Sequence, residues 1–270
     1  MKKLIEKIKN KIIHLTTEKL PRLFIDPWEK WRNVFSRNLA IANAAKGWSV
    51  VIITGGNDLL TLEEVVASID RELFGTPAEI VLVGPPKLKL NQPCSLPIKY
   101  LSYKDSKFVP ALITRKKNFG VRLCQYDKVA ICHDYILFEP GWKKGWDDFG
   151  DNFDVAMNQI KDKDGTRSLD WLVKDYPGVG VGFLPYHAEA ARYQYISGTY
   201  FVVKRDFYLA NPLDEKLRWG GGEDVEWSRR IRTKTIFKFN SGSIVRSAKL
   251  KGHIAEWDEN NLLLQKIFNT

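Results

Sequence analysis

Apolar segments typical of strands alternate with amphipathic segments typical of helices, and this alternation constrains the fold most. The first three strand-like runs are residues 49–54, 79–83 and 127–132. Between the first two, residues 61–74 place apolar side chains at the spacing of one helix face. Strands joined by helices form a mostly parallel sheet, and ligands gather outside the carboxyl ends of its strands. The sequence therefore predicts an α/β chain with a Rossmann-like central sheet flanked by helices.

The rest of the chain continues this mixture without an internal repeat. The predicted helices are residues 116–126, 223–232 and 260–268, and the predicted strands are residues 153–160 and 199–204. A glycine-rich segment, residues 177–182, connects the two strands, and we expect it to be a loop that closes over a bound ligand. One domain is predicted over residues 46–270, preceded by a distinct segment over residues 1–45.

That N-terminal segment is predicted to be basic, amphipathic and helical. Residues 1–32 carry nine Lys or Arg and four Asp or Glu, so they hold half of the formal net charge of +10. Apolar residues recur at helical spacing between the lysines: Leu4, Ile5, Ile8, Ile12 and Leu15. A second helix is predicted over residues 29–46. Such a segment binds an anionic membrane surface, or it docks on its own domain or on a partner subunit; the sequence leaves both open.

Hydropathy, cysteine usage and charge indicate location and partners. No apolar run approaches the roughly 20 residues that span a bilayer, and lysines interrupt any secretory signal. Cys94, Cys124 and Cys132 form no C-x-x-C pair, which favours free thiols in a reducing compartment. The expected location is the cytoplasm, with peripheral attachment to the inner membrane face through residues 1–32. The basic excess favours phosphate-bearing partners, but aromatic residues spread through the strands disfavour nucleic acid.

A glycine-rich motif followed by two acids is the most specific chemical signal. Three glycines and two adjacent carboxylates follow one tryptophan, and a second tryptophan comes three residues later: Trp219, Gly220, Gly221, Gly222, Glu223, Asp224 and Trp227. Glycines let the backbone approach a ligand, and the helix dipole favours the ionised form of a first-turn carboxylate, as a general base requires. Aromatic rings beside a polar loop are typical of sugar sites. The alternative is a helix N-cap with first-turn acids after a flexible loop.

Two further residues are candidate metal ligands. Asp134 follows the strand over residues 127–132, so it is expected at the ligand-binding edge of the sheet, where it can hold a hard divalent ion. His253 follows a glycine late in the chain and can complete such a site. The alternatives are an acid that caps a strand end and a histidine satisfied in the core.

A basic cluster precedes the Asp134 strand. Lys116, Lys117 and Arg122 lie in the predicted helix, with Arg115 next to them. Arginine binds phosphate through two parallel hydrogen bonds and lysine binds it as a point charge. The cluster therefore predicts a phosphate clamp, and the alternative is a solvated helix face.

The order of these elements resembles that of a GT-A fold glycosyltransferase. The first half is similar to family 2 enzymes in its strands and in the acid after the third strand: residues 49–54, 79–83 and 133–135. The second half is similar to the acceptor region of β-1,4-galactosyltransferase-type enzymes: residues 196–201, 204–205, 211–215 and 219–224. The resemblance covers most of the chain, residues 48–253.

This resemblance implies a nucleotide-sugar-dependent transferase of the hexosyltransferase type. A UDP-sugar is the favoured donor, and the cofactor is a divalent metal, Mn²⁺ or Mg²⁺. The implied donor-binding residues are Thr54, Gly55, Lys117, Arg122 and Asp134. The implied metal ligands are Asp134, in the place of the family's D-x-D acid, and His253.

The resemblance also assigns the acceptor side. Asp224 is the implied catalytic base, and the implied acceptor-binding residues are Trp219, Gly221, Gly222 and Glu223. We expect Asp134 and Asp224 to face each other across one cleft, so that the sugar is transferred with inversion to a hydroxyl of a glycan or lipid-linked acceptor. Such a reaction fits the synthesis of a surface polysaccharide or glycolipid.

Two alternatives remain open on the sequence. A sugar nucleotidyltransferase needs a basic, glycine-rich loop after the first strand, whereas residues 55–58 contain neither Lys nor Arg. A catalytically silent GT-A scaffold that binds polyanions accords with the basic N-terminal segment but leaves the acids Glu223 and Asp224 without a role.

Overall fold

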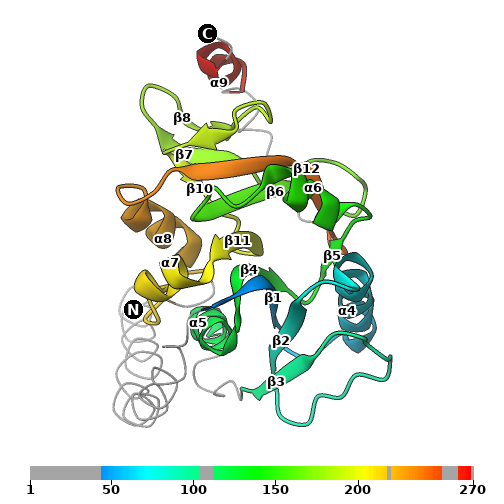
Figure 1. Cartoon of the computed structure of the whole chain (residues 1–270). Coiled ribbons are helices and arrows are strands. Elements are labelled where there is room, and N and C mark those ends of the chain that lie inside the picture. The colour runs from blue at the N-terminus through cyan, green and yellow to red at the C-terminus, as the bar shows by residue number, and fades with distance from the viewer. Residues whose placement is uncertain (1–43, 104–111, 218–219, 251–260, 269–270) are drawn as a thin grey trace, which may run out of the picture.

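The computed structural model describes residues 44–103, 112–217, 220–250 and 261–268 (Figure 1). The strands are β1 (Ala45–Ile53), β2 (Ala78–Gly84), β3 (Ile98–Ser102), β4 (Tyr126–His133), β5 (Ile136–Phe138), β6 (Val155–Lys161), β7 (Leu172–Tyr176), β8 (Gly180–Phe183), β9 (Ala190–Ala191), β10 (Gln194–Tyr195), β11 (Tyr200–Lys204) and β12 (Phe237–Ser247). The helices are α4 (Leu59–Leu73), α5 (Ile113–Leu123), α6 (Trp142–Phe149), α7 (Arg205–Ala210), α8 (Glu223–Ile231) and α9 (Asn261–Phe268).

The large sheet is mixed, but most of its strands run in one direction. Its order is β3-β2-β1-β4-β11-β6-β12-β5, and β9 pairs with β12. β3, β2, β1 and β4 pair parallel to one another. β11 lies antiparallel between β4 and β6, and β6 then pairs parallel with β12. Among the described strands of this sheet, β5, β9 and β11 run the other way. The predicted mostly parallel central sheet is confirmed.

β1 and β2 form the centre of the core because their sequences are apolar on both faces. Val50, Val51 and Ile52 are all fully buried. Ile52 lies opposite Leu82 of β2 and Cys132 of β4, as expected for parallel strands covered on both sides. β1 begins at Ala45, so the helix predicted over residues 29–46 is wrong at its C-terminal end. The Ala45 N–H donates to the Gln125 carbonyl beside β4, which draws this end into the sheet.

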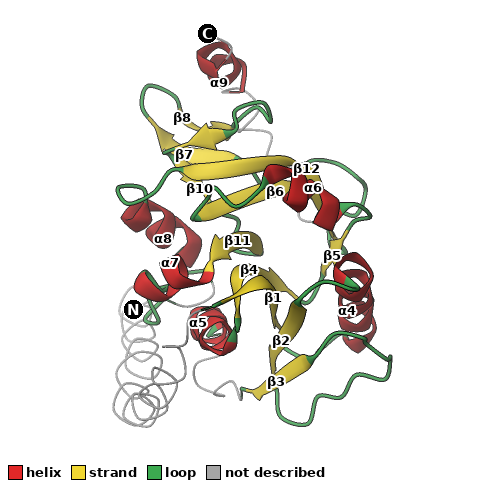
Figure 2. Cartoon of the chain, viewed as in Figure 1, coloured by secondary structure: helices red, strands yellow, loops and turns green. Residues whose placement is uncertain are grey.

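Helices cover both faces of these strands (Figure 2). The Asp58 carboxylate accepts a hydrogen bond from the Thr61 N–H at 3.0 Å and so caps α4. On the other face, α5 lies against β1 and β2 at Gly120, where a Cβ atom would come within 2.4 Å of Val51 Cγ1. The glycine therefore sets the close approach of α5 to the sheet. α5 starts three residues before the predicted helix, at Ile113.

Aromatic packing joins the second half of the chain to the first. The Trp48 ring in β1 contacts the rings of Trp142 and Trp146 in α6, with centroids 4.7 Å and 5.6 Å apart. Trp142 Nε1 also donates to the Tyr200 hydroxyl of β11 at 3.0 Å. The strands on either side of β4 therefore share one core.

The small sheet has the order β10-β7-β8 and corrects one prediction. The segment over residues 177–182 is the turn and second strand of a β-hairpin, because β8 pairs antiparallel with β7. Gly178 and Gly180 have φ of 76° and 85°, which glycine adopts readily, so the glycines serve a tight turn.

Other predictions have mixed outcomes. All three cysteines are free thiols, as expected. The segment over residues 1–43 lies outside the described residues. Within the described part of the chain, no helix is long and apolar enough to cross a membrane.

Candidate active site

The predicted acidic motif lies where a loop enters α8. Gly220 and Gly222 have φ of 76° and 70°, a backbone conformation that side chains with a Cβ disfavour. α8 then begins at Glu223, and its first turn carries Glu223, Asp224 and Glu226. The free N–H groups at a helix start favour negative charge. The glycines thus shape the turn, and the acids stand at the end of the helix that favours negative charge.

Gly198 holds the Asp224 carboxylate in place. Asp224 Oδ2 accepts a hydrogen bond from the Gly198 N–H at 3.1 Å, and Oδ1 accepts one from the Val225 N–H at 2.9 Å. A Cβ atom on Gly198 would lie 2.9 Å from Asp224 Oδ2 and 3.0 Å from Glu223 Oε1. A glycine is therefore needed here if both acids are to keep these positions.

A buried lysine lies beneath the acids. Lys117 Nζ donates to the Gly198 carbonyl at 2.6 Å and to Glu223 Oε1 at 3.2 Å. The side chains of Lys117 and Glu223 are 1% and 8% exposed. Burial lowers the pKa of Lys117, while the Glu223 and Asp224 carboxylates oppose that fall. Lys117 therefore neutralises Glu223, and Asp224 forms no ion pair among the described residues.

The acids open onto a cleft of about 470 Å³, within the range of small-molecule sites. Glu223, Asp224 and Gly222 line one side of it. Residues from three other parts of the fold also line it: His133, Tyr135, Leu169, Leu172, Lys174 and Ile196. Burial and the charge of Asp134 raise the pKa of Tyr135, so its hydroxyl stays protonated at neutral pH. The cleft thus combines a carboxylate, a protonated phenol and an apolar wall.

Asp134 lies at the end of β4, as predicted, and is joined to the end of β1. The Thr54 hydroxyl donates to Asp134 Oδ2 at 2.5 Å and accepts the Gly56 N–H at 2.8 Å. His133 and Tyr135, on either side of Asp134, line the acid cleft. Asp134 itself is not among the described residues that line it. The structure therefore places Asp134 beside the cleft, turned towards the loop after β1.

The remaining predicted residues fall into three groups. Gly55 and Gly221 are exposed in their loops. Arg122 Nη2 pairs with Glu215 Oε1 at 3.0 Å, so its guanidinium has a carboxylate partner within the chain. Trp219 and His253 lie outside the described residues.

Of the two predicted metal ligands, the structure describes only Asp134. Among the described residues, no group of three His, Cys, Asp or Glu side chains gathers to hold a metal ion. Asp134 offers one carboxylate, and Mg²⁺ is commonly bound through one or two carboxylates together with substrate phosphates. The residues present therefore fit a cation that takes most of its ligands from a diphosphate.

Several cleft residues were missed from the sequence. Gly198 lies in the segment 196–201 that carries the resemblance, but no role was predicted for it. The need for a glycine there follows from its contact with Asp224, 26 positions later. Leu169, Leu172 and Lys174 lie in and beside β7, which the sequence pattern did not predict. An apolar residue at a ligand site carries the same local signal as one in the core.

Solved structures similar to this chain are glycosyltransferases of the GT-A fold. S. aureus TarS 1–349 in complex with UDP-GlcNAc matches at 15% sequence identity with a TM-score of 0.51, over 77% of this chain and 60% of that chain. GalNAc-T7 with UDP, GalNAc and Mn²⁺ matches at 15% identity with a TM-score of 0.53, over 83% of this chain and 48% of that chain. No family model and no curated protein sequence matches this chain.

The chain thus spans 60% of the TarS 1–349 structure and less of GalNAc-T7. At this level of identity the similarity shows the fold. A large, mostly parallel sheet with helices on both faces is common to these structures, and the chain has a GT-A type of fold.

Proposed function

We propose that this chain is a glycosyltransferase that moves a sugar from a nucleotide-diphosphate sugar to an acceptor hydroxyl with inversion. The observation that carries the proposal is the position of Asp224, whose carboxylate lines the 470 Å³ cleft from the first turn of α8 without an ion-pair partner among the described residues. The GT-A fold is the second support, because the similar structures hold UDP-GlcNAc, or UDP with GalNAc.

Asp224 is the proposed catalytic base. An acceptor hydroxyl in the cleft would lose its proton to this carboxylate as its oxygen attacks the anomeric carbon of the donor. The bond from that carbon to the nucleotide diphosphate breaks on the opposite side, so the configuration inverts. The two N–H groups that bind the carboxylate fix its orientation. Glu223, held by Lys117, is proposed to bind acceptor hydroxyls together with Trp219, Gly221 and Gly222.

The donor is proposed to lie along the ends of β1 and β4. Thr54, Gly55 and Asp134 form that edge, and the hydrogen bond between Thr54 and Asp134 ties the two strand ends together. Asp134 would hold a divalent cation, with His253 as the second proposed ligand. When bound, Mn²⁺ or Mg²⁺ supplies positive charge for the diphosphate leaving group. Mn²⁺ accompanies UDP in the GalNAc-T7 structure.

The acceptor and the cellular role are finer parts of the proposal. The order of the acidic motif supports an acceptor region of the β-1,4-galactosyltransferase type, acting on a glycan or lipid-linked acceptor in surface polysaccharide synthesis. Attachment to the inner membrane face through residues 1–32 remains a prediction. Deletion of those residues tests this prediction. If they anchor the chain, the deletion variant no longer binds anionic vesicles.

The test of the base compares two acids of one helix turn. Asp224→Asn should lower kcat by at least about a hundredfold while donor binding is kept, as for loss of a general base. The matched control is Glu226→Gln, because Glu226 lies in the same turn but pairs with Arg230 at 2.7 Å. The assay measures nucleotide diphosphate release from UDP-sugars with simple aryl glycosides as acceptors.

The outcomes separate the alternatives. Transfer by Asp224→Asn within a few-fold of the unaltered chain would refute Asp224 as the base. Pyrophosphate release from a nucleoside triphosphate and a sugar phosphate would favour the nucleotidyltransferase. Donor binding without transfer to any acceptor would favour the silent scaffold.

A further inference from the structure

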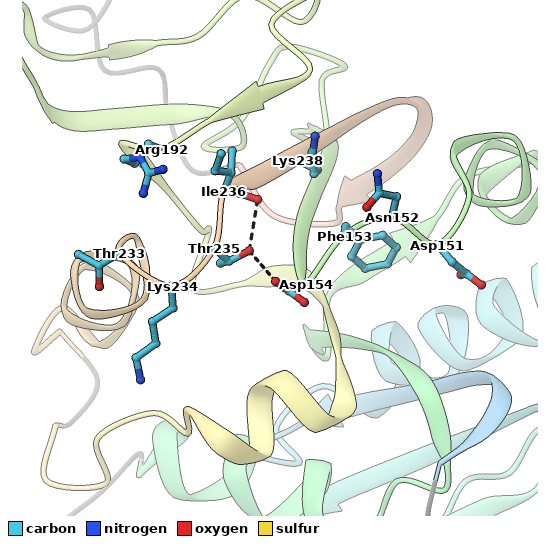
Figure 3. A pocket seen from close by; sticks show the side chains of 10 residues that line it. All are labelled: Asp151, Asn152, Phe153, Asp154, Arg192, Thr233, Lys234, Thr235, Ile236 and Lys238. Atoms are coloured by element: carbon cyan, nitrogen blue, oxygen red, sulfur yellow. Dashed lines mark hydrogen bonds between the residues drawn. The ribbon is translucent and has the colours of Figure 1, made fainter.

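A second cavity, of about 550 Å³, lies at the strand ends opposite to those that carry the acid cleft. Figure 3 shows the residues that line it. It is lined by the loop before β6 and the turn before β12. Lys128 of β4 pairs with Lys204 of β11, and Ala156 of β6 pairs with Lys238 of β12, so the cavity lies at the amino ends of β4, β6 and β12. The acid cleft lies beyond His133, at the carboxyl end of β4. The second cavity is therefore separate from the proposed donor and acceptor sites.

Three cations line this cavity, and none of them has a carboxylate partner among the described residues. Arg192 Nη1 donates to the Arg232 carbonyl at 2.8 Å, and Lys234 Nζ donates to the Asn211 side-chain oxygen at 2.5 Å. Lys238 has no hydrogen bond or ion pair from its ammonium group within the described ranges. Figure 3 shows Arg192 and Lys234 on the side of the cavity opposite Asp151. None of these partners is an acid, so the positive charge of the three cations is not neutralised within the described part of the chain.

The acids of the cavity already have partners. Asp151 binds Lys128 and Lys204, each at 3.2 Å, and Lys46 at 3.5 Å. Although burial raises the pKa of Asp151, the hydrogen bonds and charges of these lysines lower it to about 2. Asp154 Oδ2 accepts a hydrogen bond from the Thr235 hydroxyl at 2.8 Å, as drawn in Figure 3. The cavity therefore carries an excess of positive charge.

Polar and apolar groups stand side by side in the same cavity. Asn152 and Thr233 are exposed, and their side chains form no hydrogen bond with other described residues. Phe153 forms part of the wall, and Ile236 is 44% exposed. Free amide and hydroxyl groups beside apolar side chains suit a ligand that has hydroxyl groups and an apolar face.

We propose that this cavity binds an anionic saccharide, that is, a sugar unit that bears a phosphate or a carboxylate group. Arg192 and Lys238 bind the anionic group through charge-assisted hydrogen bonds, and Lys234, whose ammonium is held by Asn211, adds positive charge to the same wall. Asn152 and Thr233 bind the sugar hydroxyls, and Ile236 contacts the ring. The volume of about 550 Å³ lies within the range of small-molecule sites. This proposal stands on the second cavity alone and does not depend on the transferase reaction.

The test measures binding of three small probes to the full chain at low ionic strength. Glucose 1-phosphate and glucuronate carry the two anionic groups, and glucose is the neutral probe. Isothermal titration should show saturable binding of at least one anionic probe, at least about tenfold tighter than that of glucose, because charge-assisted hydrogen bonds are about twice as strong as neutral ones. The tighter of the two anionic probes identifies whether phosphate or carboxylate is preferred.

Two double variants of equal charge change locate the site. Lys234→Gln with Lys238→Gln should weaken binding of the anionic probe at least about tenfold. Lys143→Gln with Lys144→Gln removes the same charge from α6, where both lysines already pair with aspartates at 2.5 Å. This control should bind within about twofold of the unaltered chain, since loss of distant charge alone is screened.

Three results would overturn the proposal. They are no saturable binding of either anionic probe, equal affinity for glucose, and equal effects of the two double variants. Binding at the acid cleft would survive both double variants and so counts against the second cavity. Circular dichroism and Tm check folding. If the double variant fails to fold, Lys238→Gln alone replaces it. The Lys238 ammonium has no partner among the described residues, so this change breaks no ion pair there.

Discussion

The acid cleft and the second cavity, at opposite ends of the strands of the large sheet, balance their charges in different ways. At the acid cleft, one buried cation, Lys117, pairs with Glu223, and Asp224 is left with its charge available. At the second cavity, Asp151 forms ion pairs with three lysines, and its side chain is 48% exposed. The first arrangement is a single pair in the core, and the second is a cluster at the surface.

Burial decides how much each arrangement contributes to stability. Removing one partner of a buried pair costs about 3–5 kcal/mol, because the other charge stays buried without compensation. Exposed pairs contribute about 0–1 kcal/mol, since water and salt screen them. The acid cleft therefore depends on one cation, Lys117, whereas Asp151 in the second cavity keeps two lysine partners when one is lost.

The largest expected effect is at Lys117. Lys117→Met keeps the length of the side chain but leaves the Glu223 carboxylate buried and unpaired. We expect the free energy of unfolding at pH 7 to fall by about 3–5 kcal/mol, measured by urea denaturation. A loss below about 1 kcal/mol would contradict the role of burial, because the pair would then behave as an exposed one.

A double variant separates the charge effect from packing. In Lys117→Met with Glu223→Gln the carboxylate that lost its partner is also gone, so the chain should recover much of the lost stability, since replacing both partners of a buried pair is often close to neutral. Failure to recover would mean that the hydrogen bond from Lys117 to the Gly198 carbonyl, not the ion pair, dominates.

An intermediate effect is expected at Gly198. Gly198→Ala places a Cβ atom 2.9 Å from Asp224 Oδ2, so the carboxylate must move. We expect kcat to fall about tenfold or more, because small displacements of a reacting group cost large factors. The measurement is the same transfer assay that tests Asp224.

Gly165→Ala is the matched control for that variant. Gly165 has a φ of 84° and no heavy atom within 4 Å of an added Cβ, so alanine there strains the backbone without touching the cleft. It should lower stability by about 1–2 kcal/mol and leave kcat unchanged. Equal losses of kcat in both variants would show that Gly198 acts through stability.

The smallest expected effect is at Asp151. Its pKa is about 2 in the folded chain against an ordinary 3.8, so the ionised form stabilises the fold above pH 3.8, and this contribution is lost as pH falls towards 2. Asp151→Asn should lower the free energy of unfolding at pH 7 by less than about 1 kcal/mol. Urea denaturation between pH 7 and pH 3 should show the difference shrinking below pH 4. A constant difference over that range would contradict the ionic origin.

Much of the fold was predictable because it depends on local patterns. β1, β2 and β4 are apolar on both faces, so their sequences indicate buried parallel strands without reference to the rest of the chain. The helix start at Glu223 was predictable from the glycines that precede it. α6 and β12 were not predicted, because the burial of Trp142 depends on contact with Trp48, far away in the sequence.

Local sequence was therefore enough to predict the parallel strands and to place Glu223 and Asp224 at a helix start and Asp134 after a strand, since each depends on neighbouring residues. Tertiary packing decided how those residues work together. Lys117 was expected to bind phosphate, yet it lies under Glu223, which is 106 positions away in the sequence. The second cavity likewise combines segments that meet because β6 pairs with β11 on one side and with β12 on the other. The physical reason is that burial and charge compensation are set by neighbours in space, and no local pattern records them.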